Sequence, residues 1–576
     1  MLAPVHAVAD VTMGTRRSGG AVGAAIRAVG HGSTGLLCHD APVQKRGAPV
    51  RDPGVEDIAG PASASVEPDE LGWPFNRRRR RTFWHPERSF PLVRRVSSIG
   101  TRRLDDFGII PDLVAAVLCL VPMILDIAPR SNLRFMVFLS CGWAIFKAVA
   151  LGHRYLTPSG IFFLSSGVFI GLAAYYLLAA GTVNDWESLN TGANIAFLST
   201  LGISVFATVF RAGWKVSWPE SGELPRVGPG NAPEFFLPKA FLLIALSQIP
   251  FLKAGFLAVT TGAGLAGVMM AVLYTSNRRL RIRWAGDFVI VLVAAAAPLL
   301  WMRFEFTGSG RLTLAGLGIA SLMVWNFSRP RPLHKIVVFL AIPGFLLFAG
   351  SDRLGSNERV SGEAVIASGD GLESMYSPLD TFVELTRKTD QTEGESTGPQ
   401  WGKTFYAASV IPVPRSIWPN KPIGLGADLT RMLRGRMLRL KMIAPEHSMA
   451  ALAQGEWYVN FRWPGVVAMT LPLGWFLARL DRWHANLTRT QLRAPSNWWS
   501  LAMLACVCNS LGDLMWVGSF TFMARGGMAV LAVGIVWLVS TNRRKWSREP
   551  FDIKSAPILG RGDTYRATNA GKGTQR

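Results

Sequence analysis

Apolar residues run along much of the chain in stretches close to the length that crosses a bilayer. Residues 1–107 contain no such stretch, but from Gly108 onward apolar runs follow one another with short polar links between them. Because a transmembrane helix needs about 20 consecutive, mostly apolar residues, the pattern predicts an all-α polytopic membrane protein. It predicts about twelve transmembrane helices, at 108–128, 133–152, 160–181, 190–210, 239–252, 254–275, 285–302, 312–328, 334–350, 462–480, 498–517 and 524–541.

The spans 239–252 and 254–275 are separated only by Lys253, so they could form one long span or a hairpin. The connection before them carries Arg211 and Lys215, and the connection after them carries four arginines within 278–283. Basic connections gather on the cytoplasmic side of a membrane, which places both connections on that side. A hairpin satisfies this condition, and the same rule places both termini in the cytoplasm.

The span map divides the chain into five parts. We expect a disordered basic cytoplasmic arm, nine transmembrane helices, an extracytoplasmic loop with the candidate active-site residues, three more transmembrane helices and a basic cytoplasmic tail. Their predicted bounds are 1–107, 108–350, 351–461, 462–541 and 542–576.

Charge changes the picture in one respect. The chain has a formal net charge of +23, yet only 17% of its residues are charged and 49% are hydrophobic. A nucleic-acid-binding protein rarely combines such charge with so many apolar residues, so we expect no nucleic acid among its partners. The basic excess is instead interpreted as a topology signal, and the five arginines at 77–81 as an attraction to anionic membrane lipids.

The loop 351–461 has two halves of opposite character. Residues 351–395 carry ten acidic and four basic residues, whereas 396–461 carry eight basic and three acidic residues. The Ser, Gly, Glu and Asp content of the first half predicts a flexible segment, and the tryptophans of the second half predict an ordered one.

The segment WGKTFYAASVIPVPRSIWPNKPIGL, which begins at Trp401, carries the most specific chemistry. Prolines on both sides of Arg415 and Trp418 stiffen the backbone around these two side chains, and Lys421 follows. A guanidinium, an ammonium and an indole plane suit a phosphate or a sugar phosphate. The alternative is a surface loop whose tryptophan only anchors at the membrane interface.

Two further stretches of the loop are candidates. Residues 428–443 predict a basic amphipathic helix, which would either attract lipid headgroups or only seat the loop. His447 and Glu456 are candidate catalytic residues because an imidazole or a carboxylate can act as a general base. Tyr458 and Asn460 lie beside Glu456 at the predicted membrane boundary and are candidate substrate-binding residues.

Ionisable residues also lie close to the predicted apolar zone. Arg311, Asp513 and Arg525 are candidate substrate-binding residues, because charges at this depth are costly unless they are paired or face a wet cavity. Asp513 and Arg525 could instead form a purely structural pair. Lys147, within the second predicted span, is expected to extend its ammonium toward the interface.

No metal or other cofactor is expected. The chain lacks an Asp-x-Asp motif, and Cys506 and Cys508 are two residues apart, so they do not share a helix face. Cations for any phosphate chemistry would therefore come from Arg and Lys side chains.

Together these motifs resemble the O-antigen polymerase family, the Wzy-type oligosaccharide repeat-unit polymerases. IPVPRSIWPNKP is similar to a recurring IPR-x-x-WP-x-KP signature, and WGKTFY before it and GEWYVNF after it fall in the same large loop. The resemblance covers roughly 108–545. It departs from the family at Arg462, where members usually have Gly, and in the long N-terminal arm.

The resemblance implies a fold like that of the GT-C-type glycosyltransferases that use lipid phosphosugars. It implies that a glycan is transferred from a polyprenyl pyrophosphate carrier to the next lipid-linked repeat unit, on the outer face of the bacterial cytoplasmic membrane. Arg415, Lys421 and Glu456 match the family's basic and acidic loop positions. The implied substrate is a polyprenyl-pyrophosphate-linked oligosaccharide, and a chain-length regulator and a flippase are candidate partners.

Three other classes fit parts of the pattern, one of them an interaction or scaffold subunit of an envelope assembly. An O-antigen ligase would use the same chemistry with another acceptor. A non-enzymatic flippase or exporter of lipid-linked oligosaccharides would explain the spans and charges, but would not need a large ordered outer loop.

Overall fold

The computed structural model describes most of the chain beyond residue 107. The described residues are 108–180, 185–219, 235–277, 311–328, 373–391, 399–432 and 449–546, with a few further positions at 232–233 and between 330 and 340. The chain divides into the units Met1–Trp84 and His85–Arg576, and all described residues belong to the second. Within them every regular element is a helix, which confirms the all-α class.

Five of these helices are long and apolar enough to cross a membrane: Pro129–Ala150, Pro158–Ala179, Trp186–Gly213, Phe256–Ser276 and Ser519–Thr541. Three shorter helices, Ile110–Ile124, Phe236–Ser247 and Leu312–Phe327, are also apolar. Large apolar side chains on their outer faces are exposed, Val117, Phe138 and Ile535 among them. Such faces suit lipid, so the chain is an α-helical membrane protein. The predicted span 285–302 and most of 334–350 lie outside the described residues.

The N-terminal helices are α2 (Ile110–Ile124), α3 (Pro129–Ala150), α4 (Pro158–Ser166), the π-helix η3 (Gly167–Leu172), α5 (Ala173–Ala180) and α6 (Trp186–Gly213). Proline in the first turn starts α3 and α4, where its missing N–H costs nothing. The Thr157 side chain accepts a hydrogen bond from Gly160 N, and Asp185 accepts one from Ser188 N, so polar caps fix the starts of α4 and α6.

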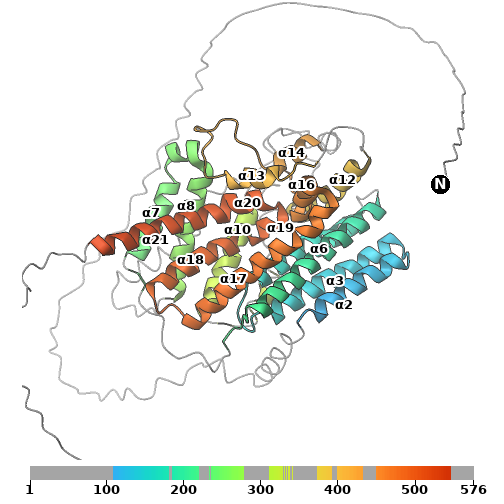
Figure 1. Cartoon of the computed structure of the whole chain (residues 1–576), viewed down its shortest axis with the longest axis horizontal. Coiled ribbons are helices and arrows are strands. Elements are labelled where there is room, and N and C mark those ends of the chain that lie inside the picture. The colour runs from blue at the N-terminus through green and yellow to red at the C-terminus, as the bar shows by residue number, and fades with distance from the viewer. Residues whose placement is uncertain are drawn as a thin grey trace, which may run out of the picture. The chain divides into compact units, whose positions relative to one another are not determined.

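The pair α7 (Phe236–Ser247) and α8 (Pro250–Asn277) forms two helices rather than one long span. They pack side by side (Figure 1), and a Cβ on Gly267 of α8 would lie 2.4 Å from the Ala240 carbonyl oxygen of α7. The helix α10 (Arg311–Ser328) follows.

The helices between residues 373 and 432 are α12 (Glu373–Gln391), α13 (Lys403–Ser409) and α14 (Leu425–Met432). The expectation of a flexible first half was wrong for α12. Leu379, Phe382, Val383 and Thr386 share one face of this helix and are buried. The acidic composition of this segment hid the apolar periodicity that makes it a packed helix.

The C-terminal helices are α16 (Leu452–Ala468), α17 (Thr470–Thr490), α18 (Pro495–Asn509), α19 (Leu511–Trp516), α20 (Ser519–Phe522), the π-helix η4 (Met523–Gly527) and α21 (Met528–Trp546). The predicted boundary between loop and span at 461 and 462 falls inside α16. The segment 452–460 is buried and helical, but Arg462 has non-helical φ and ψ, so a kink at this boundary separates that helical piece from the predicted span.

Close helix contacts occur at glycines. A Cβ on Gly474 of α17 would lie 2.6 Å from the Phe206 Cβ of α6, and one on Gly316 of α10 would lie 2.0 Å from the Asn509 carbonyl oxygen of α18. Small residues let membrane helices approach closely, so these two positions fix the spacing of α6 with α17 and of α10 with α18.

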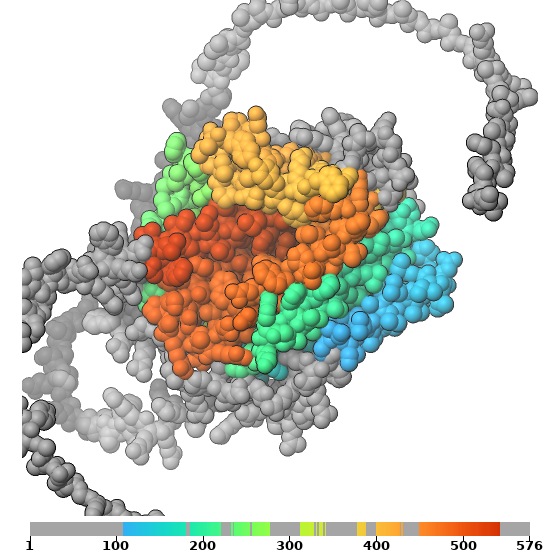
Figure 2. Space-filling view, viewed as in Figure 1, coloured from blue at the N-terminus to red at the C-terminus, as the bar shows by residue number. Residues whose placement is uncertain are grey.

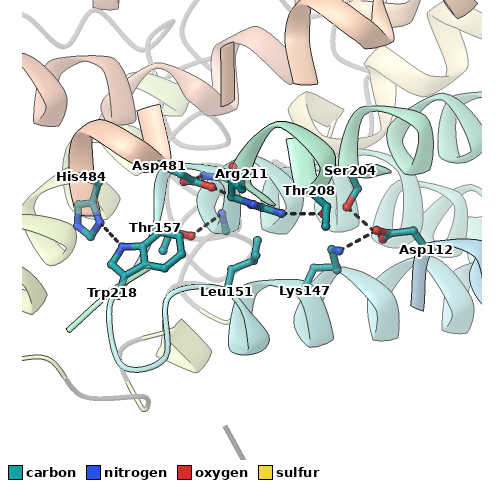
Figure 3. A network of polar contacts seen from close by, with 12 residues as sticks. Asp112, Lys147, Leu151, Thr157, Ser204, Thr208, Arg211, Trp218, Asp481 and His484 are labelled. Atoms are coloured by element: carbon teal, nitrogen blue, oxygen red, sulfur yellow. Dashed lines mark hydrogen bonds and ion pairs between the residues drawn. The ribbon is translucent and has the colours of Figure 1, made fainter. Parts of the chain in front are cut away.

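Lys147 does not extend toward an interface, which corrects the sequence expectation. Its Nζ lies 2.8 Å from Asp112 Oδ2, and both side chains are buried. Trp143 Nε1 and Ser204 Oγ each donate to Asp112 Oδ1 at 3.0 Å. Figure 3 shows Asp112 between Lys147 and Ser204. The carboxylate on α2 therefore binds α3 and α6 together.

The bundle has two distinct ends. The helices α12, α13 and α14 gather at one end, here called the loop end (Figure 1). The turn 151–157 and the C-terminal parts of α6, α10 and α17 meet at the other, here called the far end, where Asn326 accepts from Leu156 N and Trp218 contacts His484.

Candidate functional site

Glu456 lies on α16 at the loop end, with its side chain buried. Its carboxylate accepts two hydrogen bonds from Ser519, from N at 2.6 Å and from Oγ at 2.7 Å. Gly518 before that serine has φ of 103°, and a Cβ there would lie 2.2 Å from Glu456 Oε2. Only glycine fits this turn, so Glu456 and Gly518 together fix the start of α20.

Asn460, one helical turn after Glu456, is also buried and connects α16 with α13. Its Nδ2 donates to Thr404 Oγ1 at 2.6 Å and to the Glu456 carbonyl at 2.8 Å. Its Oδ1 accepts from Gly402 N at 3.0 Å. Asn460 therefore fixes the start of α13 against α16.

Asp513 and Arg525 meet across an irregular part of the last helices. Arg525 Nη1 lies 2.5 Å from Asp513 Oδ1, with Asp513 buried and one fifth of the Arg525 side chain exposed. Asp513 Oδ2 is buried and makes no hydrogen bond within the structure. Arg525 lies in the π-helix η4, and such single-turn segments occur often at functional sites.

The segment between Ser510 and Gly527 is therefore a broken helix rather than a continuous span. It contains the turn at Gly518, the short α20 and η4, and it carries both Asp513 and Arg525. Irregular backbone at membrane depth is tolerated only where protein or a water-filled cavity surrounds it. The hydrogen bonds from Ser519 to the buried Glu456 carboxylate attach this irregular backbone to α16.

The proline-rich loop 410–424 packs against this segment. A Cβ on Gly424 would lie 2.5 Å from the Phe520 ring, and Ile411 is buried in a cluster with Met528. The basic loop and the broken helix therefore form one continuous region, and in Figure 2 the yellow-orange surface of the loop-end helices borders the red surface of the C-terminal helices.

The cations of this loop bind their own backbone. Lys421 Nζ donates to the carbonyls of Ile411 and Val413 at 3.0 and 2.8 Å, and Arg415 Nη1 donates to those of Pro419 and Lys421 at 3.3 Å. Arg415 is exposed, whereas Lys421 is half-buried. These contacts hold the loop in a compact form with the guanidinium at the surface.

The other predicted site residues have varied surroundings. Trp418 is partly buried, with its ring 6.3 Å from that of Tyr406. The Tyr458 side chain is buried, and its ring centroid lies 5.4 Å from Cζ of the Arg462 guanidinium. Tyr458 therefore packs within the protein instead of facing a ligand. The side chain of Arg311, the first residue of α10, and all of His447 lie outside the described residues.

The pKa values of two charged groups at the loop end are shifted by their surroundings. Burial raises the pKa of the Glu456 carboxyl, and the hydrogen bonds from Ser519 and Thr404 offset this rise in part. The pKa of Lys421 is lowered, first by its loss of solvent and second by the nearby Arg415. Both shifts follow from the loss of solvent around the charged group.

Residues that sequence reasoning missed are Ser519, Thr404 and the pair of Lys403 with Asp428, whose charged atoms lie 3.1 Å apart. Each of these residues lies more than 20 positions along the chain from the residue that it contacts, so no local sequence pattern indicates the contact. Among the described residues, no group of three or more His, Cys, Asp or Glu could hold a metal ion.

The far end holds a second polar network with a structural role. Arg211 on α6 forms a buried ion pair with Asp481 on α17 at 2.7 Å (Figure 3), and Asp481 also accepts from Ser159 N at the start of α4. Beside it, Trp218 Nε1 donates to His484 Nδ1 at 3.0 Å. Burial, and secondarily Lys335, lowers the pKa of His484 to about 3, so this imidazole is neutral and serves packing.

Comparison with known proteins adds no relative to this description. No protein-family model, curated protein or solved structure matches the chain.

Proposed function

We propose that this protein is an oligosaccharide repeat-unit polymerase of the bacterial cytoplasmic membrane. It transfers a growing glycan from its polyprenyl pyrophosphate carrier to the terminal sugar of the next lipid-linked repeat unit. In this proposal the chain spans the membrane about twelve times, both termini are cytoplasmic, and the loop end faces outward. The lipid tails of donor and acceptor remain in the bilayer while the sugars meet at the loop end.

One observation carries the proposal: the exposed Arg415 belongs to a stiff loop that packs directly on the broken helix with Arg525 and Asp513. Two elements that each carry a cation thus pack against each other at one end of the apolar helices. Pyrophosphate is the leaving group that such an arrangement suits, because guanidinium groups form charge-assisted hydrogen bonds with phosphate oxygens.

The reaction assigns a role to each group. The acceptor hydroxyl oxygen attacks the anomeric carbon of the donor, the bond from that carbon to the pyrophosphate oxygen breaks, and a base takes the hydroxyl proton. Arg415 and Arg525 stabilise the departing pyrophosphate in this scheme. His447 is the proposed base. Both Glu456 oxygens accept from Ser519, which favours a positioning role for Glu456.

The test is chain extension by the purified protein in proteoliposomes that contain purified lipid-linked repeat units. We expect Arg415→Ala to lower the rate by about 100-fold or more, as the loss of a charge-stabilising donor does in other enzymes. Arg489→Ala at the far end, which removes another exposed guanidinium, should leave the rate unchanged.

The products distinguish the other classes. A ladder of polymer lengths supports a polymerase, whereas single transfer to an unrelated acceptor lipid would indicate a ligase. If Arg415→Ala cells instead accumulated repeat units on the cytoplasmic face, a transporter would replace the polymerase as the best proposal.

A further inference from the structure

Trp401 adopts a backbone conformation that large side chains avoid. Its φ is 47°, in the left-handed region, and 78% of its side chain is exposed. A bulky residue at positive φ is strained and persists only where surrounding contacts hold it. An exposed indole contributes little burial to offset this strain.

The contacts that hold the Trp401 turn come from the end of α16. Gln400 N donates to the Val459 carbonyl, and Trp401 N donates to the Asn460 carbonyl, both at 3.0 Å. Gly402 N donates to Asn460 Oδ1, also at 3.0 Å. Three consecutive backbone N–H groups are therefore fixed, and they present the indole outward from a rigid base.

The outward face of α13 continues this surface. Thr404, Ala407 and Ala408 point inward and are buried, while Lys403 and Tyr406 point outward. Lys403 forms a half-exposed ion pair with Asp428, and Tyr406 has 53% of its side chain exposed. Aromatic rings and an ion pair thus share one face, which leads through the Tyr406–Trp418 contact to the Arg415 loop.

A sugar chain fits this surface by its chemistry. The C–H faces of sugar rings pack on exposed aromatic rings, and sugar hydroxyls bond with neighbouring ammonium and carboxylate groups. The Trp401 ring meets the Phe461 ring edge to face with centroids 6.4 Å apart, and 78% of the Trp401 side chain remains exposed to pack on a sugar ring.

We propose that the outward face of α13 is a subsite for the glycan, with Trp401 as its main stacking residue. This inference rests on the proposed function, since it assigns the sugar part of the same substrate to Trp401, Lys403 and Tyr406. The pyrophosphate part then lies toward Arg415, which accounts for an aromatic surface that ends in a basic loop.

The test measures binding of the free oligosaccharide, released by mild acid from the purified lipid-linked repeat unit, to the full-length protein in nanodiscs. Trp401→Leu and Trp401→Gly should raise the Kd for the oligosaccharide about tenfold, because each removes one good aromatic contact. Trp401→Phe should raise this Kd by about threefold or less. Trp475→Leu, which removes a 47% exposed indole from α17, is the matched control and should bind as the wild type does.

Trp401→Gly also separates binding from folding. Glycine tolerates the positive φ, so the melting temperature of this variant should equal or exceed that of the wild type while the Kd for the glycan rises about tenfold. Unchanged binding in Trp401→Leu and Trp401→Gly would overturn the subsite. So would a lower melting temperature of Trp401→Gly together with retained binding.

Failure of the proposed function gives a different result. If the wild type bound the oligosaccharide in a Trp401-dependent way but extended no chains, the subsite would stand and the polymerase proposal would fall. If Arg415→Ala abolished extension and kept the oligosaccharide Kd, both would be supported, since the free oligosaccharide lacks the pyrophosphate.

Discussion

At the scale of single residues, Glu456 illustrates how a candidate catalytic side chain can act through a neighbour. Burial raises its pKa, yet both of its oxygens accept hydrogen bonds from Ser519, directly after Gly518, the glycine at positive φ between α19 and α20. The carboxylate therefore shapes the backbone that presents Arg525, and it need not touch substrate to affect the reaction.

Replacement of Glu456 should show this positioning role. Glu456→Ala leaves the Ser519 N–H buried without an acceptor and should destabilise the protein by about 1–3 kcal/mol. Glu456→Gln keeps one acceptor and should cost less and retain part of the chain-extension rate. Thermal unfolding in detergent measures the first effect and the proteoliposome assay the second.

The exposed Glu187 on α6 provides the control, because Glu187→Gln should shift stability by no more than about 0.5 kcal/mol. A Glu456→Gln protein that folded with wild-type stability but extended no chains would contradict the positioning role and identify Glu456 as the base.

At the scale of elements, breaks within helices decide where the site lies. Arg462 in α16 has φ of 59° and ψ of −156°, a conformation that is almost confined to glycine. This is the position where the chain departs from the family that it resembles, whose members usually have Gly. The structure retains the turn with an arginine, whose guanidinium lies over the Tyr458 ring.

Two substitutions at Arg462 measure the strain of that turn. Arg462→Gly and Arg462→Ala both remove the guanidinium, but only glycine tolerates the backbone. The glycine variant should therefore be more stable than the alanine variant by about 1 kcal/mol or more, as read from thermal or denaturant unfolding. Equal stability of the two variants would show that residue 462 does not adopt positive φ.

The sequence predicts some of these elements and not others, for physical reasons. Hydropathy located the helices α3, α6 and α8, because a lipid-facing helix must be apolar along its length. It missed the break at Ser510 and the helix α12, since a break enclosed by protein leaves no mark on hydropathy and α12 is apolar on one face only. Residue type alone indicated Arg415, Glu456 and the Asp513–Arg525 pair.

The partners of those residues could not be predicted. Ser519 reaches Glu456 from 63 positions away, and Asn460 reaches Gly402 from 58. Such contacts depend on how α13, α16 and α20 pack, which a single sequence does not specify. The buried position of Tyr458 was missed for the same reason.

At the scale of the whole molecule, polar chemistry is divided between two ends. The loop end carries the exposed Arg415 and Trp401, whereas the far end carries buried networks around Asp481 and His484. The far end also holds Arg154, Arg211 and Arg482, which the positive-inside rule assigns to the cytoplasm.

Membrane-impermeant maleimide labelling tests this orientation. Ser409→Cys on α13 should label in intact spheroplasts, because Ser409 is exposed at the loop end. Arg489→Cys on α17 should label only after permeabilisation. The parent chain with its five native cysteines serves as the background. Labelling of both positions from the same side would contradict the proposed topology.

The Asp112–Lys147 pair bears on how the protein enters the membrane. Asp112 on α2 is neutralised only when Lys147 on α3 lies beside it, and Ser204 on α6 completes its hydrogen bonds. A lone charge on an apolar helix is costly in lipid. Stable insertion of α2 therefore depends on helices synthesised after it, so the first helices of the chain must associate during biogenesis before any of them is released singly into the bilayer.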